Sequence, residues 1–238
     1  MRLKEIYSLL DRISPFELQE SWDNSGLQVG NWEQEIENIY LCIDVDEELV
    51  DSLPPRSLLV THHPLIFSKL RSIEYSSYPS KLLVSMIKKD IAHIAMHTNF
   101  DKTHLGVYVA RNVLGVEPKC EEFVCYFEKE GSFEELLEWV RERFGLVCPR
   151  YVPTSRKIKK VAMVTGSGGS LMDRIEADLF LTGDLKYHDA MKAKVLGLGV
   201  IDIGHFESER HFSEALQEQL KKESIKAIIA AIKNPLKA

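Results

Sequence analysis

Hydrophobic positions along the first half of the chain alternate between helical spacing and continuous apolar runs. Leu3, Ile6, Leu9, Leu10 and Ile13 lie on one side of a helix that Pro15 ends. The apolar runs at 36–46, 57–64 and 91–98 predict buried strands, and we expect helices over 47–53, 79–89 and 103–115, the last ended by Gly115. Because strands alternate with helices, this half predicts a largely parallel sheet with helices on both faces.

The same alternation begins again after Pro118. We expect strands at 121–127, 159–165, 178–183, 199–204 and 226–232, and helices at 132–144, 187–195 and 207–222. The fold class is therefore α/β, with two α/β lobes whose sheets are mostly parallel or mixed and are flanked by helices. We place the lobes at residues 1–118 and 119–238, and the last helix can also pack back on the first lobe.

Composition excludes several classes of protein. Of the 238 residues, 45% are hydrophobic and 28% charged, and the net charge is −6, which argues against general binding to nucleic-acid phosphates. There is no apolar run of 18 residues and no signal-peptide pattern at the N-terminus, so we expect a cytoplasmic protein without a membrane partner. The four cysteines have no C-x-x-C spacing, which predicts reduced thiols rather than a disulfide framework or a thiolate zinc site.

Residues that can bind metal follow three of the predicted strands. His62 and His63 end one strand, and two further clusters follow other strands: His97 with Asp101, and His205 with Glu209. Open α/β sheets place their ligand sites at the carboxyl ends of strands. Three such clusters are more specific than any one of them, and they predict a shared metal centre.

Local geometry suggests how these residues divide their roles. Neighbouring residues on a strand point to opposite faces, and Pro64 favours an extended His63. We therefore expect His62 and His63 to serve two neighbouring ions; the alternative is one ligand and one packed histidine. His205 and Glu209 are stacked one helical turn apart, in line with an apolar stripe that continues through Phe212, Leu216 and Leu220.

The remaining candidates have structural alternatives. Asp101 is either a ligand, which can bridge two ions as Glu209 can, or the N-cap of the following helix. His97 can orient a ligand from outside the coordination sphere. Asp23 and Asn24, in the polar segment 21–30, are either substrate or proton-handling groups or parts of a capped turn.

Two segments of the second lobe are candidates for anion binding. The glycine-rich turn at 164–174 lies between a strand and a helix but matches neither a Walker motif nor G-x-G-x-x-G, so it is a weak phosphate loop. Asp184, Lys186 and His188 follow another strand. Lys186 can contact an anionic substrate, or this segment is an ordinary helix start.

Five motifs in order, SWDNSGLQVG, THHPLIF, HTNFD, TGDLKYHDA and GHFESER, resemble the NGG-one-interacting-factor-three-like family, whose bacterial members are labelled GTP cyclohydrolase I type 2 homologues. The resemblance implies a short form without the inserted middle domain, a dinuclear metal site in the cleft between two lobes, and a toroidal homohexamer built as a trimer of dimers. It also implies the metal ligands His62, His63, Asp101, His205 and Glu209. One ion would take one of the paired histidines with Asp101 and Glu209, and the other ion the second histidine with His205 and Glu209.

This mixed nitrogen and oxygen donor set favours two divalent ions of zinc, manganese, iron or nickel over calcium or magnesium. Two such ions can lower the pKa of a shared water. The sequence therefore predicts a metal-dependent hydrolase acting on a nucleotide or another phosphorylated, anionic small molecule. The alternative is a non-catalytic metal-binding oligomer that serves as a scaffold or regulatory interaction protein. A DNA-binding regulator is disfavoured by the net charge.

Overall fold

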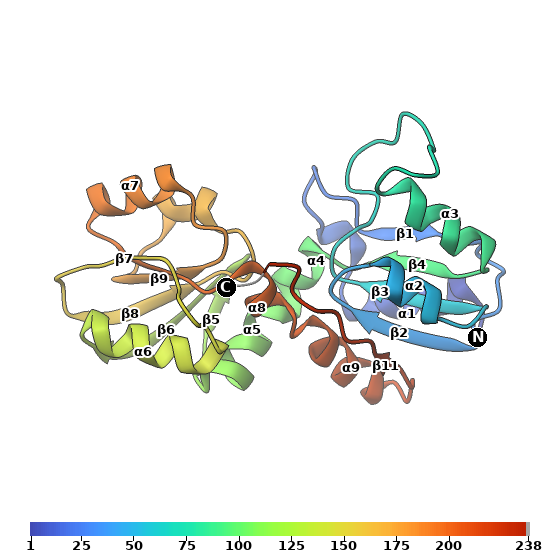
Figure 1. The fold of residues 1–238 in the computed structure, drawn as a ribbon. Coiled ribbons are helices and arrows are strands. Elements are labelled where there is room, and N and C mark those ends of the chain that lie inside the picture. The colour runs from blue at the N-terminus through green and yellow to red at the C-terminus, as the bar shows by residue number, and fades with distance from the viewer. Residues whose placement is uncertain (237–238) are drawn as a thin grey trace. The chain divides into compact units, whose positions relative to one another are not determined.

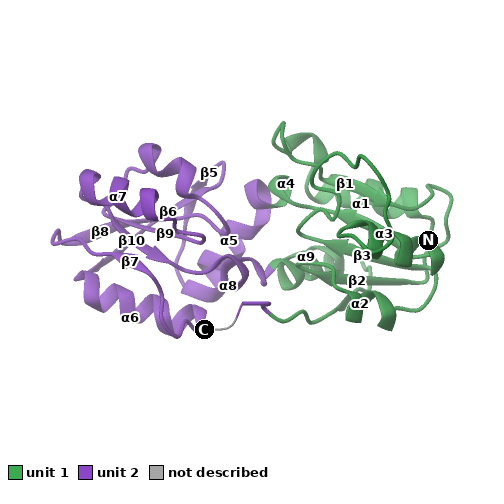
Figure 2. Ribbon diagram, turned by 45° about the horizontal axis from the view of Figure 1, so that its top comes forward, with its two compact units in different colours: residues 1–100, 212–233 green, residues 101–211, 234–238 purple. Residues whose placement is uncertain are grey.

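The computed structural model describes residues 1–236 and divides the chain into two compact units (Figure 2). Unit 1 holds residues 1–100 and 212–233, and unit 2 holds residues 101–211 with residues 234–236. This differs from the predicted boundary at 118, because the helical segment after residue 100 packs on the strand and helix of unit 2 that follow it. The last long helix belongs to unit 1, the alternative that the sequence left open.

Unit 1 is built on a mixed five-stranded sheet within the described residues (Figure 1). Its strands, in spatial order, are β1 (Gly26–Val29), β4 (Ala92–Ala95), β3 (Ser57–Thr61), β2 (Asn38–Cys42) and β11 (Ile228–Ile229). β4, β3, β2 and β11 run parallel, and β1 pairs antiparallel with β4. All five residues of β3 are buried, which explains its unbroken apolar sequence.

Helices surround this sheet where the hydrophobic spacing predicts them. They are α1 (Leu3–Ile13), the short η1 (Phe16–Leu18), α2 (Glu47–Ser52), α3 (Ser80–Lys88) and α9 (Phe212–Lys222). The Asp46 carboxylate accepts the Leu49 N–H and so caps α2. α9 packs on β2. The helices predicted at 3–13, 47–53 and 79–89 are therefore confirmed, whereas β1 lies in the polar segment 21–30, where no strand was predicted.

Unit 2 contains a mixed six-stranded sheet within the described residues. The strands, in spatial order, are β5 (Lys119–Glu121), β6 (Val124–Gly131), β8 (Ile158–Met163), β9 (Leu179–Thr182), β10 (Gly199–Asp202) and β7 (Tyr151–Val152). β8, β9 and β10 run parallel, and the outer strands pair antiparallel. Because β8, β9 and β10 are parallel, their carboxyl ends lie at the same edge of the sheet.

The helical elements of unit 2 include one unusual run. α4 (Thr98–Phe100), at the end of unit 1, continues into η2 (Asp101–Leu105), α5 (Gly106–Tyr108) and η3 (Val109–Leu114), where η2 and η3 have π-helical hydrogen bonding. Such π-type turns are often found at functional sites. The other helices are α6 (Phe133–Phe144), η4 (Gly169–Arg174), α7 (Tyr187–Leu196) and α8 (His205–Glu209). Ser132 and Glu135 form a capping box at the start of α6.

Two predicted elements differ in the structure. The strand expected at 121–127 is a hairpin, because the chain turns at Glu122 between β5 and β6. The helix expected at 207–222 is two helices, α8 and α9, with an interruption at Arg210 and His211. The chain passes from unit 2 to unit 1 at this interruption. No helix among residues 1–236 is both long enough and apolar enough to span a membrane.

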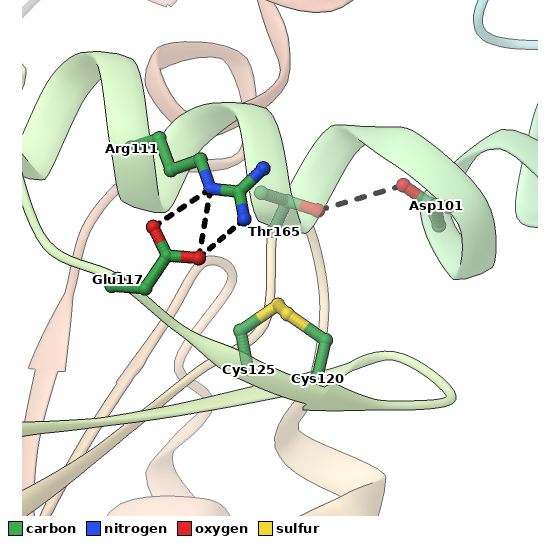
Figure 3. Close-up of a disulfide and its surroundings, with 6 residues drawn as sticks. All are labelled: Asp101, Arg111, Glu117, Cys120, Cys125 and Thr165. Atoms are coloured by element: carbon green, nitrogen blue, oxygen red, sulfur yellow. Dashed lines mark hydrogen bonds and ion pairs between the residues drawn. A yellow bond between two sulfur atoms is a disulfide. The ribbon is translucent and has the colours of Figure 1, made fainter.

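The hairpin also corrects the prediction of reduced thiols. Cys120 and Cys125 are cross-strand partners, and they form a disulfide (Figure 3). Cys42 is buried and Cys148 is exposed, both as free thiols. Gly106 lies against this disulfide, since an added Cβ there would come within 2.8 Å of the Cys125 sulfur. The spacing of the cysteines does not predict this disulfide, because the pairing depends on the turn at Glu122 rather than on a C-x-x-C motif.

Counting thiols tests the disulfide directly. In non-reducing denaturant, we expect a thiol reagent to detect two thiols per chain, those of Cys42 and Cys148. After reduction the count should rise to four. Four thiols before reduction would contradict the disulfide, and a Cys120→Ser variant provides the control, since it should show three thiols without reduction.

His93 lies in the core of unit 1 rather than at its edge. Its side chain is fully buried on β4, and its Nε2 is 2.7 Å from the Thr61 hydroxyl. Burial lowers the pKa of His93 to about 3, because the charged ring would lose its hydration. The folded protein therefore keeps His93 neutral at pH values where the unfolded chain protonates it.

This burial predicts an acid-dependent loss of stability. Because the folded-state pKa lies below the unfolded value, the unfolded state binds an extra proton as the pH falls below about 6.5. The free energy of unfolding should then fall by up to about 1.4 kcal/mol per pH unit from this group. Urea unfolding between pH 7 and pH 4 should show a shallower loss in His93→Gln than in the wild type. Exposed His188→Gln is the matched control, and equal slopes for the wild type and His93→Gln would contradict the assignment.

Candidate metal centre

Three histidines come together at the ends of β3 and β4 in unit 1. His62 and His63 directly follow β3, and His97 follows β4 by one intervening residue. One nitrogen of each ring lies within 4.8 Å of one nitrogen of each of the others. The ring centroids are 5.0 Å apart for His62 and His63, 5.1 Å for His62 and His97, and 5.5 Å for His63 and His97. Unit 1 by itself therefore holds a group of imidazoles that could bind a metal ion.

The expected divergence of His62 and His63 is wrong. β3 ends at Thr61, and the Thr61 hydroxyl donates to the carbonyl of His63 at 2.6 Å. The chain therefore turns directly after the strand, and the alternation of side chains along a regular strand no longer applies to the two histidines. Their rings approach each other instead of pointing to opposite faces.

Each of these histidines is oriented through its Nδ1 atom. His62 Nδ1 lies 3.0 Å from the carbonyl oxygen of Met96, His63 Nδ1 lies 2.9 Å from Asp44 Oδ1, and His97 Nδ1 lies 2.8 Å from Asp23 Oδ1. Because carbonyl and carboxylate oxygens only accept hydrogen bonds, Nδ1 must carry the hydrogen. A neutral ring then has its lone pair on Nε2, the arrangement usual for histidines that bind metal.

Asp23 has a structural role that the sequence left undecided. Its carboxylate is fully buried and accepts from His97 Nδ1, from the Thr98 N–H and hydroxyl, and from the Ser25 hydroxyl. Burial raises the pKa of Asp23, but the hydrogen bond and charge of His97 and the hydrogen bonds from Thr98 and Ser25 outweigh it, so the pKa is lowered overall. Asp23 is therefore a carboxylate that fixes the orientation of His97.

Asn24, the other candidate in this segment, contacts backbone. Its Nδ2 donates to the carbonyl oxygen of Ile66 at 2.6 Å. The Asn24 side chain thus connects the segment before β1 to the segment after β3. This structural contact explains why a polar residue stands at position 24, and it requires no contact with a substrate.

In unit 2, His205 and Glu209 form a second group of possible ligands. His205 Nδ1 is 2.7 Å from Asp184 Oδ2, and His205 Nε2 is 2.9 Å from Glu209 Oε2. The Glu209 side chain is 4% exposed. The pair sits at the start and end of α8, so the predicted one-turn spacing is confirmed. Its alignment with Phe212 in one continuous helix is wrong, because α8 ends at Glu209.

The glycine-rich turn makes room for Glu209 rather than for phosphate. Gly166 has φ +62°, and a Cβ there would collide with the Glu209 carboxylate. The Gly166 N–H donates to the Ser208 hydroxyl at 3.0 Å, and the Gly168 N–H donates to the Thr182 hydroxyl at 2.7 Å. Since these amides already have partners within unit 2, the turn is not organised as an anion cradle.

The remaining candidate residues of unit 2 have different structural roles. Asp184 orients His205, Lys186 is an exposed N-cap of α7, and His188 is exposed next to Tyr187. Asp101 begins η2, and its Oδ1 lies 3.5 Å from the Thr165 hydroxyl, which follows β8 (Figure 3). Asp44, which contacts His63, was not among the residues predicted for the site. Its signal was present, because Asp44 follows β2, the strand next to β3.

The donor chemistry of these groups fits a divalent metal ion of intermediate softness. Imidazole nitrogens with carboxylate oxygens suit zinc, iron, manganese or nickel. Three of the candidate ligands have a carboxylate on Nδ1, Asp44 for His63, Asp23 for His97 and Asp184 for His205, and such partners raise the basicity of the ring. The residues present can therefore hold metal.

Comparison with known proteins agrees with the motifs. The Duf34/NIF3 (NGG1p interacting factor 3) family matches residues 1–235. A Campylobacter jejuni protein named GTP cyclohydrolase 1 type 2 homolog is 44% identical over 99% of this chain and 98% of its own length. A Helicobacter pylori protein named GTP cyclohydrolase 1 type 2 is 40% identical, with 98% of each chain covered.

Solved structures show the same fold. A hypothetical protein of Staphylococcus aureus has a TM-score of 0.86 at 26% identity, with 100% of this chain and 99% of that chain covered. The reduced form of HcgD from Methanocaldococcus jannaschii has a TM-score of 0.80 at 28% identity, with 96% and 97% covered.

The role of Asp23 predicts the effect of a nearly isosteric change. Asp23→Asn places an amide N–H₂ against donors of Ser25, His97 or Thr98, so the free energy of unfolding should fall by about 1–3 kcal/mol. Urea unfolding measures this effect. Exposed Asp51→Asn is the control, and an Asp23→Asn protein with wild-type stability would contradict the orienting role.

Proposed function

The chain belongs to the Duf34/NIF3 family, and we propose that it is a metal-dependent hydrolase that acts on a nucleotide or another phosphorylated small molecule. The observation that carries this proposal is the three-histidine group of unit 1, in which every Nδ1 is bound to an oxygen. The relatives named for GTP cyclohydrolase activity support a purine nucleotide such as GTP as the substrate.

We infer that the ligands of both units serve one dinuclear centre. The proposed ligands are His62, His63, Asp101, His205 and Glu209. Chain connectivity supports this for Asp101: it is four residues after His97, and the intervening residues are helical, so about one helical turn separates the two. The short connection from His97 supports Asp101 as a ligand of the same centre.

The same reasoning applies to Glu209. It precedes Phe212 by three residues, and the Phe212 ring lies 5.2 Å from the His62 ring within unit 1. Three extended residues span at most about 11 Å. The short connection from Glu209 to Phe212 limits how far the two residues can separate, which supports a shared centre.

The two ions would supply Lewis acidity and a water of lowered pKa. Beside them, His97 would accept a proton at Nε2, and the buried Asp23 carboxylate would stabilise the resulting imidazolium, as in other carboxylate–histidine pairs. His63 and His205 are held in the same way by Asp44 and Asp184. Assembly as a homohexamer is an expectation from the family resemblance, and light scattering can measure it on the same preparations.

The proposal is tested by metal analysis and turnover on one set of proteins. We expect the wild type reconstituted with zinc, manganese, iron(II) or nickel to bind two ions per chain and to hydrolyse at least one compound in a screen of nucleotides and phosphoesters. Glu209→Ala should bind less metal and lose at least about 100-fold in turnover, because loss of a ligand exceeds the loss typical of its supporting residues. Exposed Glu218→Ala is the matched control.

The other outcomes are equally informative. Turnover that persists in Glu209→Ala would come from a contaminating enzyme and would contradict the proposal. Two bound ions per chain without turnover of any compound would favour the metal-binding scaffold.

A further inference from the structure

Two exposed aromatic side chains lie beside His97 in unit 1. Trp22 is 57% exposed and Phe67 is 52% exposed, and their ring centroids are 6.1 Å apart. The His97 ring is 6.1 Å from Trp22 and 6.3 Å from Phe67. A single exposed apolar residue is ordinary, but a pair of exposed rings at a group of possible metal ligands is not explained by core packing.

The segment that carries Phe67 lies between β3 and α3 and is fixed by two amide side chains (Figure 1). Ile66, the residue before Phe67, donates its N–H to Gln28 Oε1 at 3.1 Å, and its carbonyl accepts from Asn24 Nδ2 at 2.6 Å. Gln28 Nε2 in turn donates to the carbonyl oxygen of Asn24 at 2.6 Å. Both backbone groups of Ile66 are thus held, and the position of the Phe67 backbone is defined.

The backbone around Trp22 is fixed as well. The Glu20 N–H donates to the Thr98 hydroxyl, and the Asp23 N–H donates to the carbonyl oxygen of Glu20, both at 2.9 Å. Asp23 is the residue after Trp22, and its buried carboxylate accepts hydrogen bonds from His97 and Thr98. The backbone segments that carry the two exposed rings are therefore held by polar contacts, which is typical of a surface organised in advance for binding.

We propose that Trp22 and Phe67 form a platform for the planar heteroaromatic ring of the substrate, a purine base, a proposal that rests on the proposed function. The two ring planes are tilted by 54°, so the base stacks on one ring and meets the other at an angle. Purine faces stack on tryptophan and phenylalanine, and such contacts contribute strongly to the binding of bases. A base on this platform is next to His97, and His97 adjoins His62 and His63. The platform would therefore hold the base beside the proposed reaction centre.

Charge on the same segment fits a nucleotide. Lys69 and Arg71 follow Phe67 by two and four residues, and both are exposed. They offer cations to a phosphate attached to the stacked base. The platform and these cations together favour a purine nucleotide over an uncharged aromatic compound or a sugar phosphate.

The test measures binding to the EDTA-treated, metal-free full chain, so that it does not depend on turnover. In calorimetric titration, we expect guanosine 5′-monophosphate to bind more tightly than ribose 5-phosphate. Trp22→Leu and Phe67→Leu should each weaken guanosine 5′-monophosphate about 10-fold, as expected for loss of one stacking contact. Trp22→Phe should restore part of the affinity.

Trp32→Leu is the matched control, since Trp32 is 46% exposed in the same unit and packs against Tyr7 instead of a histidine. Equal affinity of wild type and Trp22→Leu for guanosine 5′-monophosphate, or no binding by either, would overturn the platform. So would a change in oligomeric mass in Trp22→Leu without a change in affinity, which would make the two rings a contact between copies of the chain. Stacking-dependent binding without hydrolysis would leave the platform standing and contradict only the proposed hydrolase.

Discussion

The hydrogen bonds at the Nδ1 atoms of the histidines are the constraint on which the candidate site depends. An imidazole can present either nitrogen, and the side chain can rotate, so a histidine near a strand end is not yet a ligand. Met96, Asp44 and Asp23 each place an oxygen at one Nδ1, which fixes both the ring orientation and the position of the hydrogen. Unit 2 repeats the device with Asp184 and His205. Both units therefore orient a candidate ligand in the same way.

The polar motif at residues 21–30 supports this arrangement on two sides. Asp23 fixes His97, while Asn24 and Gln28 fix the segment after β3. Asp23, Asn24 and Gln28 thus all help to position side chains and backbone around the three histidines. The glycine-rich turn after β8 has a corresponding task in unit 2, because Gly166 leaves the space that the Glu209 carboxylate occupies.

The sequence predicted what depends on local pattern. Helical spacing located α1 and α6, the continuous apolar run located β3, and the metal-capable side chains were found because they follow strands. It failed where the outcome depends on contacts distant in the chain. The divergence of His62 and His63 followed from strand alternation, but the hydroxyl of Thr61 turns the chain directly after β3. The hydrophobic spacing over 207–222 continues across Arg210 and His211 and therefore predicted one helix. The structure has two, because α8 belongs to unit 2 and α9 to unit 1. The Cys120–Cys125 disulfide follows from hairpin register, which spacing alone does not reveal.

Long-range ¹H–¹⁵N correlation spectra of the metal-free protein test the central claim most directly, because they report which nitrogen of each histidine carries the hydrogen. In the neutral rings of His62, His63 and His97, the account predicts a protonated Nδ1 and a bare Nε2, with the Nε2 signals of His62 and His63 shifting when zinc is added. Spectra in which these rings carry their hydrogen on Nε2, or in which zinc leaves the signals unmoved, would contradict it.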